Sequence, residues 1–138
     1  MNDPVPPLPA PSEDQLRLLS VFHYVFAGFA VLGMGFLALH YGLMSQWMDP
    51  GIWEGRANPP PAGFMEFFAW IYVAMGLMLL LGLVLNVVAA RSLRTRRRWM
   101  LCAVVAGLNC LQFPVGTVLG VFTLVVITRT DVRASFRD

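Results

Sequence analysis

Three long stretches of the chain carry little or no formal charge, and short polar segments separate them. They cover residues 18–48, 64–90 and 99–128, and the first and third are thirty-one and thirty residues long. About 20 apolar residues are enough to cross the roughly 30 Å of hydrocarbon in a bilayer. The pattern therefore predicts membrane-spanning helices joined by short connections.

Pro114-Val115-Gly116 interrupts the third stretch, and two arrangements fit this interruption. One kinked helix would cross the membrane once and leave six arginines on one side and four on the other. A hairpin that turns near Pro114 would place nine arginines on one side and one on the other. Loops rich in Lys and Arg normally face the cytoplasm, so this rule favours the hairpin and places both termini there.

The hairpin has a cost in length. Arms of roughly 15 residues reach only about 22 Å at 1.5 Å per residue, which is short of a full bilayer. Lipid also offers no hydrogen-bond partners to the backbone groups of a turn. We therefore expect the tip of the hairpin to be buried inside the protein.

The predicted fold is all-α, an integral membrane four-helix bundle whose last two helices form a short hairpin around Pro114-Gly116. The tail that precedes the bundle contains five prolines, which block helix formation. The expected parts are a flexible Pro-rich cytoplasmic tail (1–14) and a single transmembrane helical domain (15–138), with spans at about 18–46, 64–90, 98–113 and 115–129, an external loop (47–63) and a basic cytoplasmic loop (91–98).

Composition supports the same class, since 57% of the residues are hydrophobic, only 13% are charged and the mean hydropathy is +0.64. All ten basic residues are arginines, and eight of them lie at or after Arg91. Arginines that border apolar helices favour anionic lipid headgroups over nucleic acid as partners, or else they only set the topology. The residues concerned are Arg91, Arg94, Arg96, Arg97, Arg98, Arg129 and Arg133.

Small and polar residues at helical spacing predict where helices pack against one another. Gly82, Asn86 and Ala90 recur every four residues in the second stretch. Small residues also line one side of the third helix, and two glycines share a face of the fourth. Such faces allow helices to approach closely, within a subunit or between subunits. The predicted packing residues are Gly82, Asn86, Ala103, Gly107, Pro114, Gly116 and Gly120.

Candidate groups for chemistry are few and far apart. His23 and His40 are seventeen residues apart on one helix, which is about 25 Å, so they cannot share one ion. Cys102 and Cys110 are about 12 Å apart along the third helix, beyond the reach of a disulfide. We expect an interior or interfacial polar contact for His23. We expect no enzymatic activity, no cofactor and no catalytic, cofactor-binding or metal-ligating residue.

Glu66, Asn86 and Asn109 are polar groups at the depth of the predicted membrane. Such residues often line the path of a solute through a membrane protein. They also form hydrogen bonds between helices, worth about 1 kcal/mol each. Hydrogen bonding is the favoured role here, and a polar path through these three residues is the alternative.

Two segments resemble a group of small bacterial membrane proteins with no assigned activity. Leu16–Tyr24 contains the pattern Leu-x-x-Phe-His-Tyr. Leu108–Phe136 contains the more specific pattern Pro-x-Gly-Thr-x-Leu-Gly-x-Phe-Thr-Leu, followed by a basic tail. Together the segments cover about a quarter to a third of the chain. The resemblance implies four helices with both termini inside, and it supplies no catalytic or cofactor residues. We expect a multi-pass protein of a bacterial inner (cytoplasmic) membrane.

These features predict a small inner-membrane accessory or scaffold protein that acts by helix–helix association and by contact with anionic lipid. Its partners would be lipids with anionic headgroups at the cytoplasmic face, and either further copies of the chain or another membrane protein. An oligomeric small channel or transporter is the first alternative. A membrane-embedded immunity protein against a toxin is the second.

Overall fold

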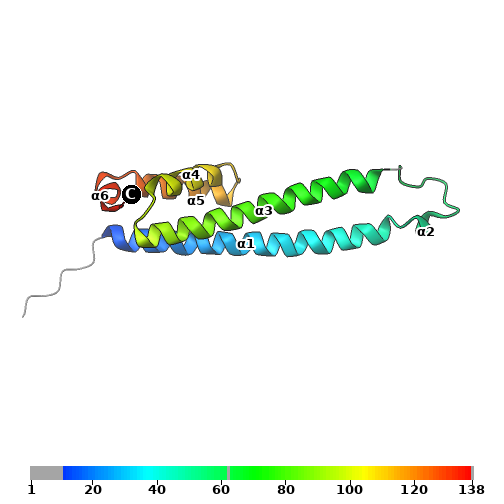
Figure 1. Cartoon of the computed structure of the whole chain (residues 1–138), viewed down its shortest axis with the longest axis horizontal. Coiled ribbons are helices and arrows are strands. Elements are labelled where there is room, and N and C mark those ends of the chain that lie inside the picture. Colours follow the sequence, from blue (N-terminus) through cyan, green and yellow to red (C-terminus); the bar gives the residue numbers. More distant parts are fainter. Residues whose placement is uncertain (1–10, 62, 138) are drawn as a thin grey trace, which may run out of the picture. The chain divides into compact units, whose positions relative to one another are not determined.

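The regular structure of this chain is helical throughout the part that the computed structural model describes, residues 11–61 and 63–137. The helices are α1 (Pro11–Trp47), α2 (Pro50–Trp53), α3 (Phe64–Thr95), α4 (Trp99–Cys110), α5 (Val115–Ile127) and α6 (Thr130–Ser135) (Figure 1). The predicted all-α class is therefore confirmed. By length and composition α1 and α3 are able to cross a membrane, whereas α4 and α5 are apolar but shorter.

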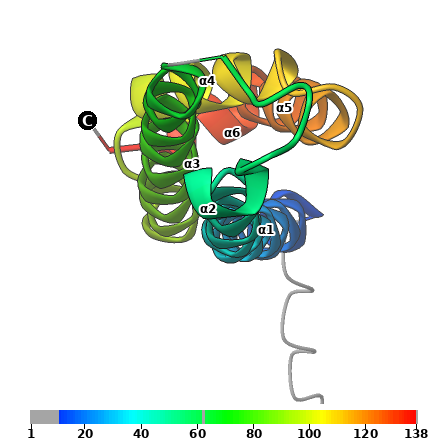
Figure 2. The same ribbon diagram turned by 90° about the vertical axis from the view of Figure 1, so that its right-hand side faces the viewer.

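The chain reverses between α4 and α5, as the hairpin arrangement predicts. The two helices lie against each other (Figure 1, Figure 2), and residues 111–114 form the turn between them. At 1.5 Å per residue α4 is about 18 Å long and α5 about 20 Å long. A single kinked helix over residues 99–128 is therefore excluded.

The tip of this hairpin is exposed, contrary to the expectation that it is buried inside the protein. Leu111 is 81% exposed and Phe113 is 88% exposed. The backbone N–H groups of Leu111 and Gln112 donate to carbonyls three residues earlier, and the Thr117 hydroxyl donates to the carbonyl of Cys110. Because the turn supplies partners for its own backbone groups, apolar side chains can be exposed here without leaving those groups unsatisfied.

Two helices extend beyond their predicted bounds. α1 begins at Pro11, so the end of the predicted tail is helical, and residues 1–10 of that tail lie outside the described part. Proline is well tolerated in the first turn of a helix. α3 continues through Thr95, which places much of the predicted loop 91–98 in helix. Arginine has a high helix propensity and is favourable near a helix C-terminus.

Other element bounds also differ from the expected ones. α4 ends at Cys110, earlier than the predicted end at 113. A proline disfavours helical backbone in the residue before it, so Pro114 shortens the helix that precedes it. The short helices α2 and α6 are absent from the sequence-based prediction, since neither is long enough to show a hydrophobic period.

The chain divides into two compact units. Unit 1 consists of residues 1–26 and 85–138, and its described part holds the start of α1, the end of α3, and all of α4, α5 and α6. Unit 2 consists of residues 27–84, and it holds the rest of α1 and α3 with α2 between them. The two long helices therefore contribute to both units.

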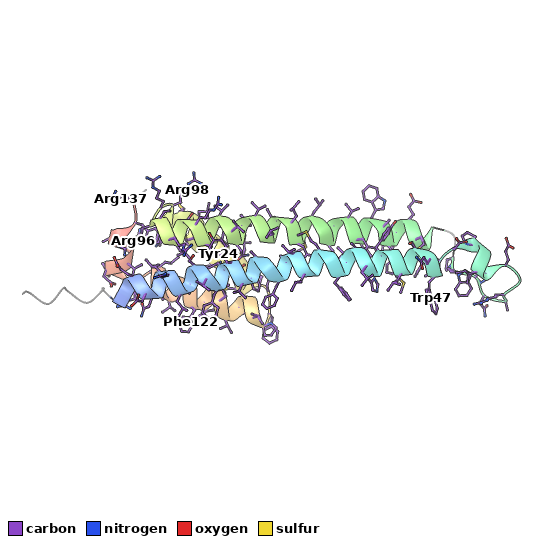
Figure 3. The ribbon with its side chains drawn as sticks, turned by 90° about the horizontal axis from the view of Figure 1, so that it is seen from below. Tyr24, Trp47, Arg96, Arg98, Phe122 and Arg137 are labelled. Carbon is purple, nitrogen blue, oxygen red and sulfur yellow. The ribbon has the colours of Figure 1, made fainter. Side chains whose placement is uncertain are left out.

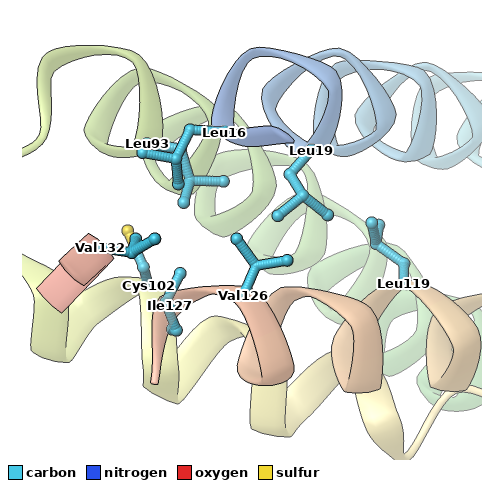
Figure 4. Close-up of a cluster of buried hydrophobic side chains, with 8 residues drawn as sticks. All are labelled: Leu16, Leu19, Leu93, Cys102, Leu119, Val126, Ile127 and Val132. Carbon is cyan, nitrogen blue, oxygen red and sulfur yellow. The ribbon is translucent and has the colours of Figure 1, made fainter. Parts of the chain in front are cut away.

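Apolar side chains from five helices meet in the core of unit 1 (Figure 4). They are Leu16, Leu19, Leu93, Cys102, Leu119, Val126, Ile127 and Val132. At the edge of this core, the indole N–H of Trp99 donates to the carbonyl of Ile127 at 2.8 Å. The guanidinium of Arg133 lies over the Trp99 ring, 4.5 Å from its centre. These contacts fasten the start of α4 to the end of α5 and to α6.

In unit 2, α1 and α3 meet along a narrow seam of small and large residues. The Leu79 side chain lies 3.4 Å from where a Cβ on Gly33 would be. The Leu37 side chain lies 3.8 Å from where a Cβ on Gly76 would be. Among the described residues of this unit, only Ala27 is buried. The outward faces of both helices are therefore open.

Candidate functional site

Four polar side chains from four helices meet inside unit 1. His23 of α1 donates from Nδ1 to Oδ1 of Asn86 on α3 at 2.8 Å. Asn86 and Asn109 of α4 pair through their amides, at 2.9 and 3.3 Å. Oγ1 of Thr123 on α5 lies 3.2 Å from Nε2 of His23. We call these residues the polar cluster, and each is at most 2% exposed.

The hydroxyl of Thr123 has two acceptors within reach and one proton. Its Oγ1 is 2.7 Å from the carbonyl oxygen of Leu119, besides its contact with His23. When Nδ1 of a neutral imidazole carries the proton, Nε2 is an acceptor, so the hydroxyl then donates to His23. The Leu119 carbonyl does not depend on that proton, because a helical carbonyl already accepts a backbone bond. Uncharged groups thus satisfy every member of the cluster.

Helical spacing explains why these side chains are buried. Asn86 is four residues from Ala90 on the buried stripe of α3, and Asn109 is four residues from Val105 on that of α4. Residues at this spacing share a face of a helix. Since these side chains are buried and bind one another, the cluster is suited to holding four helices in register.

Ser20 lies one turn before His23 on α1, and it is fully buried. Its hydroxyl has no hydrogen-bond partner among the residues described. An unsatisfied buried hydroxyl costs about 1–3 kcal/mol of stability. We expect Ser20→Ala to raise the free energy of unfolding by about 1 kcal/mol, as measured by unfolding in mixed micelles with increasing sodium dodecyl sulfate.

The matched control for this substitution is Ser45→Ala. Ser45 is exposed, and its hydroxyl donates to the carbonyl of Gly42 within the same helix. We expect a change within about 0.5 kcal/mol there. A loss of stability in Ser20→Ala would show that the Ser20 hydroxyl has a partner in the folded protein.

Two of the predicted packing residues lie at the closest approach of α4 and α5. A Cβ on Gly116 would lie 2.7 Å from the carbonyl oxygen of Asn109. A Cβ on Gly120 would lie 2.6 Å from Sγ of Cys110 and would also meet the carbonyl oxygen of Ala106. Both glycines are buried, so the two helices can approach this closely only without a side chain there.

The other predicted packing residues lie in varied surroundings. Gly107 is exposed with nothing within 4 Å of its Cβ position, so it takes no part in the packing of the described chain. Its neighbour Ala106 is buried, because one residue turns a helix by about 100°. Ala103 packs against the apolar core, Gly82 is half-buried, and Pro114 is exposed just before α5.

Of the three residues predicted for a polar path, the structure brings two together. Asn86 and Asn109 bind each other, and Asn86 also binds His23. Glu66 is exposed in the first turn of α3, twenty residues before Asn86 on that helix. The two amides therefore contribute to packing between helices.

The arginines predicted to meet lipid all lie in unit 1, on the last turns of α3, in the α3–α4 turn and after α5. Two of them form ion pairs. The guanidinium of Arg96 binds Glu13 at 2.6 Å, and that of Arg129 lies 3.5 Å from Asp131. The remaining five are Arg91, Arg94, Arg97, Arg98 and Arg133.

Sequence reasoning predicts a polar contact for His23 but does not identify its partners. Thr123 is one hundred positions away from His23 in the chain and Asn86 is sixty-three away. The available signal is that His23 and Thr123 each stand within one of the two segments that carry the resemblance. No spacing rule connects these positions.

Within the described residues, no group of three His, Cys, Asp or Glu side chains is placed to hold a metal ion. Both cysteines are free. Unit 2 contains a pocket of about 530 Å³, lined by the loop after α2 and the start of α3, including Trp53, Glu54 and Glu66. Its lining combines these two carboxylates with prolines and with the aromatic rings of Trp53 and Phe64.

Comparison with known protein families, with curated proteins and with solved structures finds no match to this chain. The class of the protein therefore follows from its own sequence and geometry.

Proposed function

We propose that this chain is a small integral membrane protein that acts as an accessory or scaffold subunit, through helix–helix association and contact with anionic lipid. The observation that carries this proposal is that polar side chains are buried while large apolar side chains are exposed. The polar cluster is buried, whereas Leu32, Phe36 and Met78 are 69%, 68% and 75% exposed. Such apolar exposure along two long helices is unfavourable in water and favourable in lipid.

The lengths of the helices support a topology in which α1 and α3 cross the membrane and the α4–α5 hairpin enters it only part of the way. The candidate membrane spans in α1 and α3 contain 35 and 32 residues, more than the roughly 20 that a bilayer requires. α4 and α5 reach only part of the way, and their exposed tip is apolar. We infer that the hairpin enters a bacterial inner membrane from the cytoplasmic side, and that both termini and the basic end of unit 1 face the cytoplasm.

The outer face of α1 supports association with a further helix. Gly28, Gly35 and Gly42 recur every seven residues, and nothing lies within 4 Å of the Cβ position on any of them. They lie on the side opposite Gly33, which faces Leu79 of α3. A seven-residue repeat of small residues fits the close packing of two membrane helices with a left-handed crossing.

Association is tested by the mass of the complex purified in mild detergent. We expect an assembly larger than one chain, and we expect Gly35→Leu to reduce it because a leucine side chain blocks close approach. Ala74→Leu, a matched change at an exposed position of α3, should leave the mass unchanged. A single-chain mass for the unmodified protein, in detergent and after cross-linking in membranes, would contradict this role.

The same preparation separates the accessory role from that of a channel. Purified protein in liposomes should leave ion flux unchanged. A flux that Glu66→Ala or Asn86→Leu alters would replace the accessory role with that of a pore.

A further inference from the structure

Two segments about forty residues apart form one pocket at the basic end of unit 1. A cavity of about 450 Å³ lies between the end of α3 with the α3–α4 turn and the end of α6 with the residues after it. Its lining residues are Thr95, Arg96, Arg97, Ser135 and Arg137. The backbone N–H of Arg137 donates to the carbonyl of Arg96 at 2.8 Å. Arg97 and Arg137 also pair as an isolated parallel bridge. Figure 3 shows Arg96 and Arg137 at the same end of this unit.

The charges of this pocket are only partly balanced. Arg96 is ion-paired with Glu13, but the guanidiniums of Arg97 and Arg137 have no hydrogen bond or ion pair within the described chain. The backbone contacts keep Arg97 and Arg137 on the same pocket, which both of them line. An anion bound there would therefore be attracted by two guanidinium groups.

The backbone of the turn favours glycine, yet it carries arginine. Arg96 has φ +50° and Arg98 has φ +56°, both in the left-handed region. Arg96 follows the last residue of α3, and the N–H of Arg97 donates to the carbonyl of Ser92. This hydrogen bond belongs to the Schellman motif, which ends many helices and usually has glycine in the left-handed position. Arginines thus occupy two positions whose backbone conformation favours glycine. Backbone strain of this kind is typical of ligand-binding segments.

An apolar stripe begins next to the pocket. Met100, Val104, Leu108 and Leu111 lie on one face of α4 and its end, and they are 73%, 56%, 43% and 81% exposed. The first of them follows Arg97, which lines the pocket, by three residues. A cationic pocket continued by an exposed apolar stripe matches a molecule with an anionic head and a hydrocarbon tail.

We propose that this pocket binds the phosphodiester headgroup of one anionic phospholipid, with Arg97 and Arg137 on the phosphate oxygens and an acyl chain along the α4 stripe. Guanidinium groups suit phosphate because they donate two parallel hydrogen bonds to it. The inference rests on the proposed membrane location, and it adds a defined site formed by Arg137 together with the α3–α4 turn.

The test measures binding of single lipids to the full-length protein in detergent by native mass spectrometry. The probes are phosphatidylglycerol, phosphatidylcholine and inorganic phosphate. We expect a tight first phosphatidylglycerol, weak phosphatidylcholine, and no displacement by millimolar phosphate. Each arginine near a headgroup contributes about fivefold, so the double variant Arg97→Gln/Arg137→Gln should bind the first phosphatidylglycerol about 25-fold more weakly.

The control variant is Arg17→Gln/Arg56→Gln, which removes the same charge from two exposed positions that do not line the pocket. It should change the first binding constant less than about threefold, because exposed charges outside the pocket are screened by salt. Equal losses in both double variants would overturn the site in favour of general attraction. Displacement of the lipid by inorganic phosphate would overturn it in favour of a free-phosphate site.

Membrane extraction with carbonate keeps this inference separate from the proposed function. If both double variants stay in the membrane fraction and bind lipid equally, the pocket fails and the membrane role stands. If the unmodified protein is released by carbonate, the membrane role itself fails.

Discussion

Gly120→Ala should destabilise the protein by about 3 kcal/mol or more. The added methyl group would meet the carbonyl oxygen of Ala106, and it would lie 2.6 Å from Sγ and 2.8 Å from the backbone nitrogen of Cys110. Two of these atoms belong to the backbone of α4, so no side chain can rotate away to make room. α4 and α5 must separate, and the unfolding midpoint in sodium dodecyl sulfate should fall accordingly.

Gly107→Ala is the matched control on the neighbouring helix. Gly107 is exposed, and its Cβ position has nothing within 4 Å. Alanine is favoured over glycine in a helix interior by about 1 kcal/mol, so this variant should be equally or more stable than the unmodified protein. Equal losses in both variants would show that α4 and α5 do not pack at Gly120.

Asn86→Leu is expected to cost about 2–4 kcal/mol, because it breaks the hydrogen bonds of Asn86 to both His23 and Asn109. It leaves Nδ1 of His23 and the amide of Asn109 buried without their partner. Hydrogen bonds between membrane helices are often worth less than about 1 kcal/mol each, so most of the loss comes from the two stranded groups. Asn58→Leu, in the exposed loop before α3, should change stability by less than about 0.5 kcal/mol.

A double-mutant cycle isolates the amide pair. Asn109→Leu alone also strands its partner, whereas Asn86→Leu/Asn109→Leu removes both amides and leaves only His23 unsatisfied. The double variant should therefore be more stable than the sum of the single losses predicts, by about 1–2 kcal/mol. Strict additivity would mean that the two amides do not interact in the folded protein.

The helical class and the reversal near Pro114 follow from the sequence because they depend on local properties. Long uncharged runs select helices, and proline selects the break. The exposure of the hairpin tip depends instead on hydrogen bonds within the turn, which hydropathy does not encode. The extension of α3 through Arg91 and Arg94 similarly depends on helix propensity, which outweighs the usual link between charge and loops.

The candidate sites were less predictable, because they depend on contacts between distant segments. Gly107 and Gly120 look alike in the sequence, and only the rotation of each helix decides which one is buried. The partnership of His23 with Asn86 and Thr123 joins three helices, and no pairwise spacing indicates it. Arg96 and Arg98 in the α3–α4 turn also have left-handed backbone conformations. The sequence does not predict this, because glycine or asparagine is the usual residue at such positions.

The central claim is that the chain crosses a membrane twice through α1 and α3 and then returns its C-terminus to the cytoplasm through the α4–α5 hairpin. Labelling of single cysteines with a membrane-impermeant reagent, in a chain whose native cysteines are replaced by alanine, tests it most directly. Asn58→Cys should react from the periplasmic side only, and Asp131→Cys from the cytoplasmic side only. Reaction of Asp131→Cys from the periplasmic side alone would contradict the account.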